Sequence, residues 1–253
     1  MNRKVLIAYE DTPQGRDAVA LGGWFAEALQ ATPVLASVFS FPRGVMANGE
    51  LDNAIARLSR RLFDAPLDEL AKLLPETRAV VDQSVGMGLI ELAEAEAPNL
   101  VVVGSCHRGA LGRTLLGSTA ESLLHGIGTA VAVAPVGFSD RALPLPARIG
   151  IAFDGSQESR TALETGIALA QRLQSQLRIL TVADYVHLGY AAEIPILTEG
   201  ELRDARQTEK RKALEQALAS VPDGIESSAE LLVGNAGPEL VQASDELDLL
   251  VAG

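Results

Sequence analysis

The strongest constraint on the fold is an internal repeat. KVLIAYEDTPQGRDAVALG, which begins at Lys4, aligns with RIGIAFDGSQESRTALETG, which begins at Arg148, at an offset of 144 residues. The match continues in two later pairs of segments, 84–94 with 232–244 and 97–105 with 245–253. A chain of 253 residues is long enough to bury two separate cores. The sequence therefore predicts two domains of one fold in tandem.

The two domains are expected at residues 1–140 and 147–253. The stretch 135–148, PVGFSDRALPLPAR, carries three prolines and no helical period, which is typical of a linker between compact units. The second copy ends at Gly253, the counterpart of Gly104. Because the counterparts of the following loop, helix and strand do not occur in this sequence, we expect the second copy to be incomplete at its C-terminus and its sheet to expose an edge.

Apolar runs of strand length alternate with segments of helical period in the first copy. Pro66 is expected at a break or a helix start, because proline lacks the N–H group that a helix interior uses. Expected strands are Val5–Tyr9, Val34–Phe39, Ala79–Asp82, Leu100–Gly104 and Ala130–Ala134; expected helices begin after Thr12 or cover Arg57–Leu74, Leu89–Ala97 and Ala120–Ile127. This alternation indicates an α/β fold with two tandem doubly wound parallel-sheet domains.

Ligands of such sheets bind at the carboxyl ends of the strands, where the strand order reverses. After the fourth strand the chain reads VVVGSCHRGALGRTLLGSTAESLLHG (101–126), with glycines at 104, 109, 112 and 117. Glycine lets a backbone approach a ligand closely and turn its N–H groups toward phosphate oxygens. The segment therefore predicts a phosphate-binding loop, in which Arg108 and Arg113 can neutralise charge.

Two explanations fit the end of this loop. Ser118 and Thr119 offer hydroxyl groups at the expected start of a helix, where free N–H groups and the helix dipole favour an anion. Alternatively, Ser118 and Glu121 have the spacing of a capping box, which needs no ligand. The capping box explains the serine and the glutamate but not the glycines before them, so phosphate binding is favoured.

GSCHRGALGRTLLGST resembles the nucleotide loop of the universal stress protein family, whose pattern is G-x-x-G, nine residues, then G-S or G-T. Gly104, Gly117 and Ser118 match this pattern. His107 stands where the pattern has its second glycine, and glycine returns at Gly109. Three roles of His107 stay open: a hydrogen bond to phosphate or ribose, a block of the pocket, or no part in the site.

The family also places an aspartate after the first strand, near adenine and ribose. Glu10 takes that register in the first copy and Asp154 in the second. A carboxylate there accepts hydrogen bonds from ribose hydroxyls or an adenine amine. Asp11 is either an alternative acceptor or a helix cap, and Val38 is expected beside the adenine. The site implied by the resemblance comprises Ala8, Tyr9, Glu10, Asp11, Val38, Gly104, His107, Arg108, Gly109, Gly117, Ser118 and Thr119.

The resemblance covers essentially the whole chain and implies an adenine nucleotide alpha hydrolase-like fold that binds ATP, with Mg²⁺ bridging the phosphates, as a module of a stress response. No nucleophile or general base is evident, so at most a slow ATPase is expected. The alternative is a scaffold or interaction protein that holds no nucleotide, which His107 and Glu10 favour. An ATP pyrophosphatase is disfavoured because the loop S-G-G-x-D-S is missing after the first strand.

Composition restricts partners and location. A formal net charge of −12 opposes nucleic-acid binding. One cysteine, Cys106, and three histidines suggest neither a disulfide framework nor a metal cluster. The start of the chain has no signal-peptide or membrane-spanning run, so a cytoplasmic protein without membrane contact is expected. Since members of the family pair through their last strands, we expect an intrachain pseudo-dimer, or a homodimer formed through Ala130–Ala134.

Overall fold

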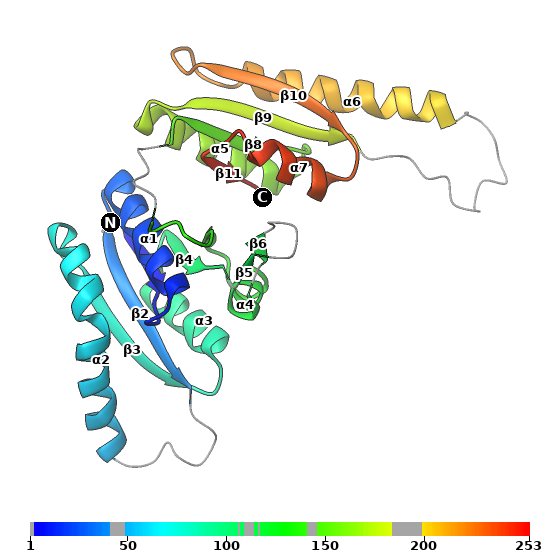
Figure 1. Cartoon of the computed structure of the whole chain (residues 1–253). Helices are drawn as coiled ribbons and strands as arrows, with labels where there is room; N and C mark the ends of the chain where they lie inside the picture. The colour runs from blue at the N-terminus through cyan, green and yellow to red at the C-terminus, as the bar shows by residue number, and fades with distance from the viewer. Residues whose placement is uncertain are drawn as a thin grey trace. The chain divides into compact units, whose positions relative to one another are not determined.

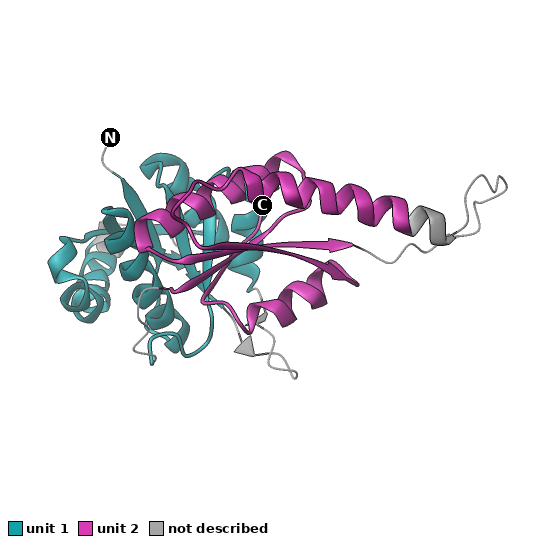
Figure 2. Cartoon of the chain, turned by 90° about the horizontal axis from the view of Figure 1, so that it is seen from above, with its two compact units in different colours: residues 1–142 teal, residues 143–253 magenta. Residues whose placement is uncertain are grey.

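The structure is a computed structural model that describes residues 3–40, 49–105, 107–108, 114–115, 117–140, 146–183 and 199–253. The chain divides into two compact units, residues 1–142 and 143–253 (Figure 2). Each unit is an open parallel sheet with helices on its faces, which confirms the predicted α/β class.

The sheet of unit 1 has five parallel strands in the order β3-β2-β1-β4-β7 (Figure 1). Its strands are β1 (Lys4–Ala8), β2 (Thr32–Ser40), β3 (Glu76–Asp82), β4 (Leu100–Gly104) and β7 (Ala130–Ala134). Its helices are α1 (Pro13–Leu29), α2 (Gly49–Glu69), the 3₁₀ turn η1 (Ala71–Leu73), α3 (Val85–Glu96) and α4 (Ser118–Gly126). Two short strands, β5 (His107–Arg108) and β6 (Thr114–Leu115), pair with each other antiparallel.

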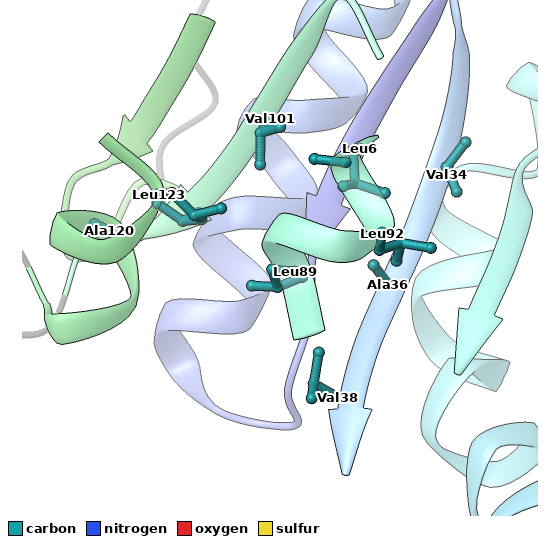
Figure 3. Close-up of a cluster of buried hydrophobic side chains, with 11 residues drawn as sticks. Leu6, Val34, Ala36, Val38, Leu89, Leu92, Val101, Ala120 and Leu123 are labelled. Atoms are coloured by element: carbon teal, nitrogen blue, oxygen red, sulfur yellow. The ribbon is translucent and has the colours of Figure 1, made fainter. Parts of the chain in front are cut away.

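Alternate residues of each strand face different helices. Leu6, Val34 and Val101 belong to a buried cluster that α3 and α4 complete with Leu89, Leu92, Ala93, Ala120 and Leu123 (Figure 3). On the opposite face, Ile7 contacts α1 and the ring of Tyr9 lies 6.3 Å from that of Phe63 in α2. Burial of both faces explains why these strands read as continuous apolar runs.

The structure corrects two details of the predicted helices. Pro66 lies inside α2, in its last turn, and not at a break or a helix start. The proline has no N–H to donate to the preceding turn, but its carbonyl still accepts a hydrogen bond from the Leu70 N–H at 3.1 Å, so the helical pattern continues past it. The N-cap of α4 is Gly117, which makes no side-chain capping hydrogen bond. The capping box between Ser118 and Glu121 is therefore wrong, because Ser118 already belongs to the first turn.

Unit 2 repeats the strand order in a four-stranded parallel sheet, β10-β9-β8-β11. Its strands are β8 (Arg148–Ala152), β9 (Gln176–Ala183), β10 (Ser227–Val233) and β11 (Leu249–Val251), and its helices are α5 (Gln157–Leu173), α6 (Glu199–Ala219) and α7 (Ala236–Ser244). The repeat extends to local geometry. Thr12 caps the start of α1 and Ser156 caps the start of α5. Both helices end at a glutamine whose backbone has the left-handed conformation, Gln30 in α1 and Gln174 in α5.

Candidate functional site

A cavity of about 120 Å³ lies at the carboxyl ends of β1 and β4. The strand order reverses between these two strands, since β2 and β3 follow on one side of β1 whereas β4 and β7 follow on the other. This is the place predicted for a ligand. The lining residues come from the ends of three strands and the starts of three helices: Ala8, Tyr9, Glu10, Thr12, Gln14, Gly15, Ala36, Val38, Val85, Leu89, Val103, Gly104 and Thr119.

One wall of the cavity is apolar. Val38 of β2 faces Leu89 of α3 in the buried cluster (Figure 3), and Val85 lies one turn earlier in the same helix. Gly88 permits this close approach, because a Cβ atom there would lie 2.8 Å from Cγ1 of Val38. The wall is suited to the face of a flat, apolar group such as a nucleobase.

The other wall consists of backbone and polar groups. The turn from β1 into α1 is tight, since the Thr12 N–H donates to the Glu10 carbonyl at 2.8 Å and the Thr12 hydroxyl accepts from the Gly15 N–H at 3.1 Å. Gly104 packs against this first turn of α1, at the carbonyl of Gln14. Packing alone thus requires a glycine at 104, in addition to the ligand approach for which the sequence suggested it.

Six of the twelve predicted site residues line the cavity: Ala8, Tyr9, Glu10, Val38, Gly104 and Thr119. Asp11 does not; its exposed carboxylate accepts a hydrogen bond from Arg16 at 3.2 Å, and the helix cap is Thr12. Gly117 and Ser118 lie at the start of α4, next to the lining residue Thr119. His107 and Arg108 are described by their backbone in β5, and Gly109 lies outside the described residues.

The sequence did not point to seven lining residues: Thr12, Gln14, Gly15, Ala36, Val85, Leu89 and Val103. Two of them could have been found. Ala36 precedes Val38 by two residues in one strand and Val103 precedes Gly104, so the period of a strand and its end place them near the predicted site. Val85 and Leu89 have no such signal, because helix packing brings them there.

The two carboxylates of the aspartate register differ in their contacts. In unit 2, the carboxylate of Asp154 accepts a hydrogen bond from the backbone N–H of Ser156 at 2.8 Å. Hydrogen bonds from the Ser156 side chain and backbone lower the pKa of Asp154. In unit 1 the corresponding backbone N–H, of Thr12, goes to the carbonyl of Glu10. The Glu10 carboxylate is therefore left available at the cavity rim.

Tyr9 lines the cavity with its phenol in the neutral form. Burial raises the pKa of the Tyr9 phenol, and the negative charges of Asp11 and Glu69 raise it further, against the opposing effect of Arg16. The Tyr9 N–H donates to the Ala36 carbonyl at 2.8 Å, which ties the end of β1 to β2. This hydrogen bond fixes the backbone of Tyr9, a residue that lines the cavity, against β2.

Within the described ranges, no group of three or more His, Cys, Asp or Glu side chains is placed to hold a metal ion. In the same ranges, no helix combines the length and apolarity of a membrane span.

Comparison with known proteins agrees with the fold. The chain matches the model of the universal stress protein family over residues 1–135 and 147–253. It is 25% identical over 169 residues to the universal stress protein Rv2319c of Mycobacterium tuberculosis, an alignment that covers 66% of this chain and 56% of the relative. The chain thus spans about half the length of that relative.

Two solved structures share the fold of the whole chain. A universal stress protein from Archaeoglobus fulgidus has a TM-score of 0.69 at 14% identity and covers 96% of this chain and 83% of its own. The protein PA1789 of Pseudomonas aeruginosa has a TM-score of 0.63 at 16% identity and covers 98% of this chain and 79% of its own. Because the family model matches nearly the full length, the chain belongs to the universal stress protein family.

Proposed function

We propose that unit 1 binds an adenine nucleotide, ATP with Mg²⁺, and that the chain acts as a nucleotide-binding module in a cytoplasmic stress response. One observation carries this proposal. The cavity at the switch point of the sheet combines an apolar wall, formed by Val38 and Leu89, with a rim of Glu10, Gly104 and Thr119.

Each part of the cavity suits one part of a nucleotide. The apolar wall accepts the base, and the carboxylate of Glu10 accepts hydrogen bonds from ribose hydroxyls. At the opposite end, Thr119 lies in the first turn of α4, whose free N–H groups favour phosphate. The volume of about 120 Å³ is below the roughly 300–1,000 Å³ of whole ligand sites, so the cavity takes part of the nucleotide and the phosphates extend from it.

Magnesium fits this arrangement without a dedicated protein cage. Mg²⁺ in nucleotide sites is held largely by phosphate oxygens and water, with one or two carboxylates. Glu10, the carboxylate that lines the cavity in the described part of unit 1, contacts the ribose in this arrangement, so phosphate oxygens and water would supply the ligands of the ion. The ion would neutralise phosphate charge. Pairing through the edge of β7, within the chain or between two chains, stays a prediction.

The proposal is tested by titrating the purified chain with Mg-ATP in a calorimeter and by its thermal unfolding in millimolar Mg-ATP. Binding to the native state should raise Tm with ligand concentration. Thr119→Glu places a negative charge at the phosphate end and should abolish the shift. Thr161→Glu, an exposed position in α5 of unit 2, is the matched control and should retain it.

The outcome also decides between nucleotide binding and a ligand-free scaffold. Absence of heat and of any Tm shift in the wild-type chain, together with no nucleotide released from freshly purified denatured protein, would support the scaffold.

A further inference from the structure

The segment that follows β7 is fastened to α1 by one buried carboxylate. Asp17 is 1% exposed and accepts hydrogen bonds from the Gly137 N–H at 2.9 Å and from the N–H and hydroxyl of Ser139, each at 2.8 Å. The first part of the predicted linker 135–148 therefore packs on unit 1. We name this contact between Asp17 and residues 137–139 the latch.

A tight turn shapes the segment for this contact. The Phe138 N–H donates to the Pro135 carbonyl at 3.1 Å, and Gly137 between them has a φ of 75°. A turn with positive φ at its third residue favours glycine there, because a Cβ atom would strain the backbone. The turn thus directs two N–H groups and one hydroxyl at the same carboxylate.

The latch has no counterpart at the same position of unit 2. Thr161 of α5 takes the place of Asp17 and is exposed. A contact that belongs to the common fold is repeated instead: the side chains of Asn99 and Asp248 accept the N–H of the first residue of β1 and of β8, at 3.1 Å and 2.9 Å. The latch is therefore an addition to the common fold, at the place where the chain leaves unit 1.

Release of the latch would leave Asp17 in an unfavourable place. Within the described ranges, no Lys, Arg or His side chain forms an ion pair with Asp17, so hydrogen bonds alone compensate its charge. A buried carboxylate without partners is strongly destabilised. Release must therefore move Asp17 toward water, and α1 must shift with it.

Such a shift reaches the cavity, because the first turn of α1 is packed backbone against backbone. Gln14 and Gly15 lie just before Asp17 in the same helix, and both line the cavity. A Cβ atom on Gly15 would collide with the carbonyl of Glu10. Gly104 lies equally close to the carbonyl of Gln14. No side chain can rotate to absorb a movement there, so Glu10 and Gly104 must move with the helix.

We infer that the latch couples the cavity of unit 1 to the connection between the two units. The nucleotide binds more tightly while the segment is latched, and its binding in turn holds the latch closed. The inference rests on the proposed function. In the latched state, unit 1 holds the connection as far as Ser139; in the released state, it holds the connection only to the end of β7. Because coupling between two equilibria is reciprocal, the latch and the nucleotide strengthen each other by the same factor.

The test uses Gly137→Ala, which strains the turn without altering α1 or a residue that lines the cavity. Calorimetry should give an affinity for Mg-ATP about fivefold or more below that of the wild type, within the usual range of coupling between sites. Trypsin measures the latch itself by cleavage after Arg141, two residues beyond Ser139. Gly137→Ala should be cleaved there faster than the wild type, and saturating Mg-ATP should slow the cleavage of the wild type about fivefold or more, since cleavage follows the population of the released state.

Asp248→Ala is the matched control, because the Asp248 carboxylate holds the other end of the same connection. It accepts hydrogen bonds from the N–H groups of Ala147 at 3.0 Å and Arg148 at 2.9 Å. This variant should have a lower Tm and wild-type affinity for Mg-ATP. Asp17→Asn weakens the latch from the side of α1 and should lower the affinity as Gly137→Ala does. The two substitutions combined should lower it no further, because they break one contact.

The outcomes separate the inference from the proposed function. If the wild type binds Mg-ATP and Gly137→Ala is cleaved faster but binds equally well, the latch serves the fold alone. If Asp248→Ala weakens binding as much as Gly137→Ala does, a general loss of stability explains the effect and the inference is wrong. If neither Gly137→Ala nor Asp17→Asn is cleaved faster than the wild type, Asp17 does not hold the segment. If the wild type takes up no ATP, the proposed function fails and the coupling fails with it.

Discussion

The α-carbon of Gly104 lies against the carbonyl oxygen of Gln14, so close that a Cβ atom on Gly104 would be 2.3 Å from that oxygen. Unit 2 repeats this contact, where a Cβ atom on Gly253 would be 2.2 Å from the carbonyl oxygen of Glu158. In both units the chain therefore packs, at or just after the end of the fourth strand, on the first turn of the first helix of that unit, α1 or α5. In unit 1 the two residues also line the cavity, which couples the packing of the fold to the shape of the site.

Gly104→Ala should destabilise unit 1 and weaken nucleotide binding. The obstacle is a backbone atom, which cannot rotate away, so the strand or the helix must move at a cost of about 1–3 kcal/mol. Denaturation with urea measures the change in the free energy of unfolding, and calorimetry measures the affinity for Mg-ATP. Gly128→Ala is the control, because a Cβ atom there meets nothing within 4 Å, and its effect should stay within about 0.5 kcal/mol. Equal stability of the two variants would contradict the packing role of Gly104.

The sheet could be predicted well from the sequence because both of its faces are buried. The strands Leu100–Gly104 and Ala130–Ala134 have the predicted ends, and the order of unit 1 places its cavity after the first and fourth strands as expected. An apolar run bounded by polar residues or turn formers marks such strands directly. The end of the fourth strand places Gly104 at the site, whereas Glu10 was expected there from the family resemblance.

The start of α3 could not be predicted from local preference. The helix was expected from Leu89, but it begins at Val85. Gly86 and Gly88 disfavour a helix by propensity, yet they let α3 approach its neighbours: Cβ atoms there would lie 2.9 Å from Ser122 and 2.8 Å from Val38. Tertiary packing thus outweighs propensity. Because the first turn was missed, Val85 was missed as part of the cavity.

Asp17→Ala should be strongly destabilising. Asp17 is 1% exposed, and its carboxylate accepts hydrogen bonds from the Gly137 N–H at 2.9 Å and from the N–H and hydroxyl of Ser139, each at 2.8 Å. Its loss removes three hydrogen bonds at a partly buried site and frees the segment after β7, at a cost of about 2–4 kcal/mol in the free energy of unfolding. Ser139→Ala removes one bond and should cost about 1 kcal/mol.

Urea denaturation at neutral pH measures both effects. Asp11→Ala serves as the control, since Asp11 is exposed and forms a surface ion pair with Arg16, and it should change stability by less than about 1 kcal/mol. If Asp17→Ala lowers the free energy of unfolding no more than Asp11→Ala does, Asp17 does not anchor the segment after β7.

The decrease of the free energy of unfolding at acid pH should depend on Glu96. Hydrogen bonds from Lys4 and then Arg78 lower the pKa of this carboxyl in the folded chain. A lowered pKa in the folded state means that the stabilisation is present above the pKa of the unfolded chain, about 4.3, and is lost as pH falls through the folded value. Glu96→Gln should therefore be less stable than the wild type at pH 7, and the difference should shrink toward pH 3. Urea midpoints at both pH values measure it, and a constant difference would contradict the ion pairs.

Glu10→Ala should weaken the binding of ATP by acting on the ribose. Because the Glu10 carbonyl, and not its carboxylate, accepts the Thr12 N–H at 2.8 Å, the carboxylate is available for the ligand. Loss of a charged acceptor from one ribose hydroxyl should reduce affinity about tenfold.

Calorimetry with ATP, 2′-deoxy-ATP and 3′-deoxy-ATP identifies which ribose hydroxyl Glu10 contacts. For the analogue that lacks the contacted hydroxyl, wild type and Glu10→Ala should bind alike, because the pair of partners is already broken. Glu27→Ala, an exposed carboxylate of α1 outside the cavity, should leave all three affinities unchanged. If Glu10→Ala weakens both deoxy analogues as much as ATP, the carboxylate does not bind the ribose, and its place at the rim must serve the base or the metal ion.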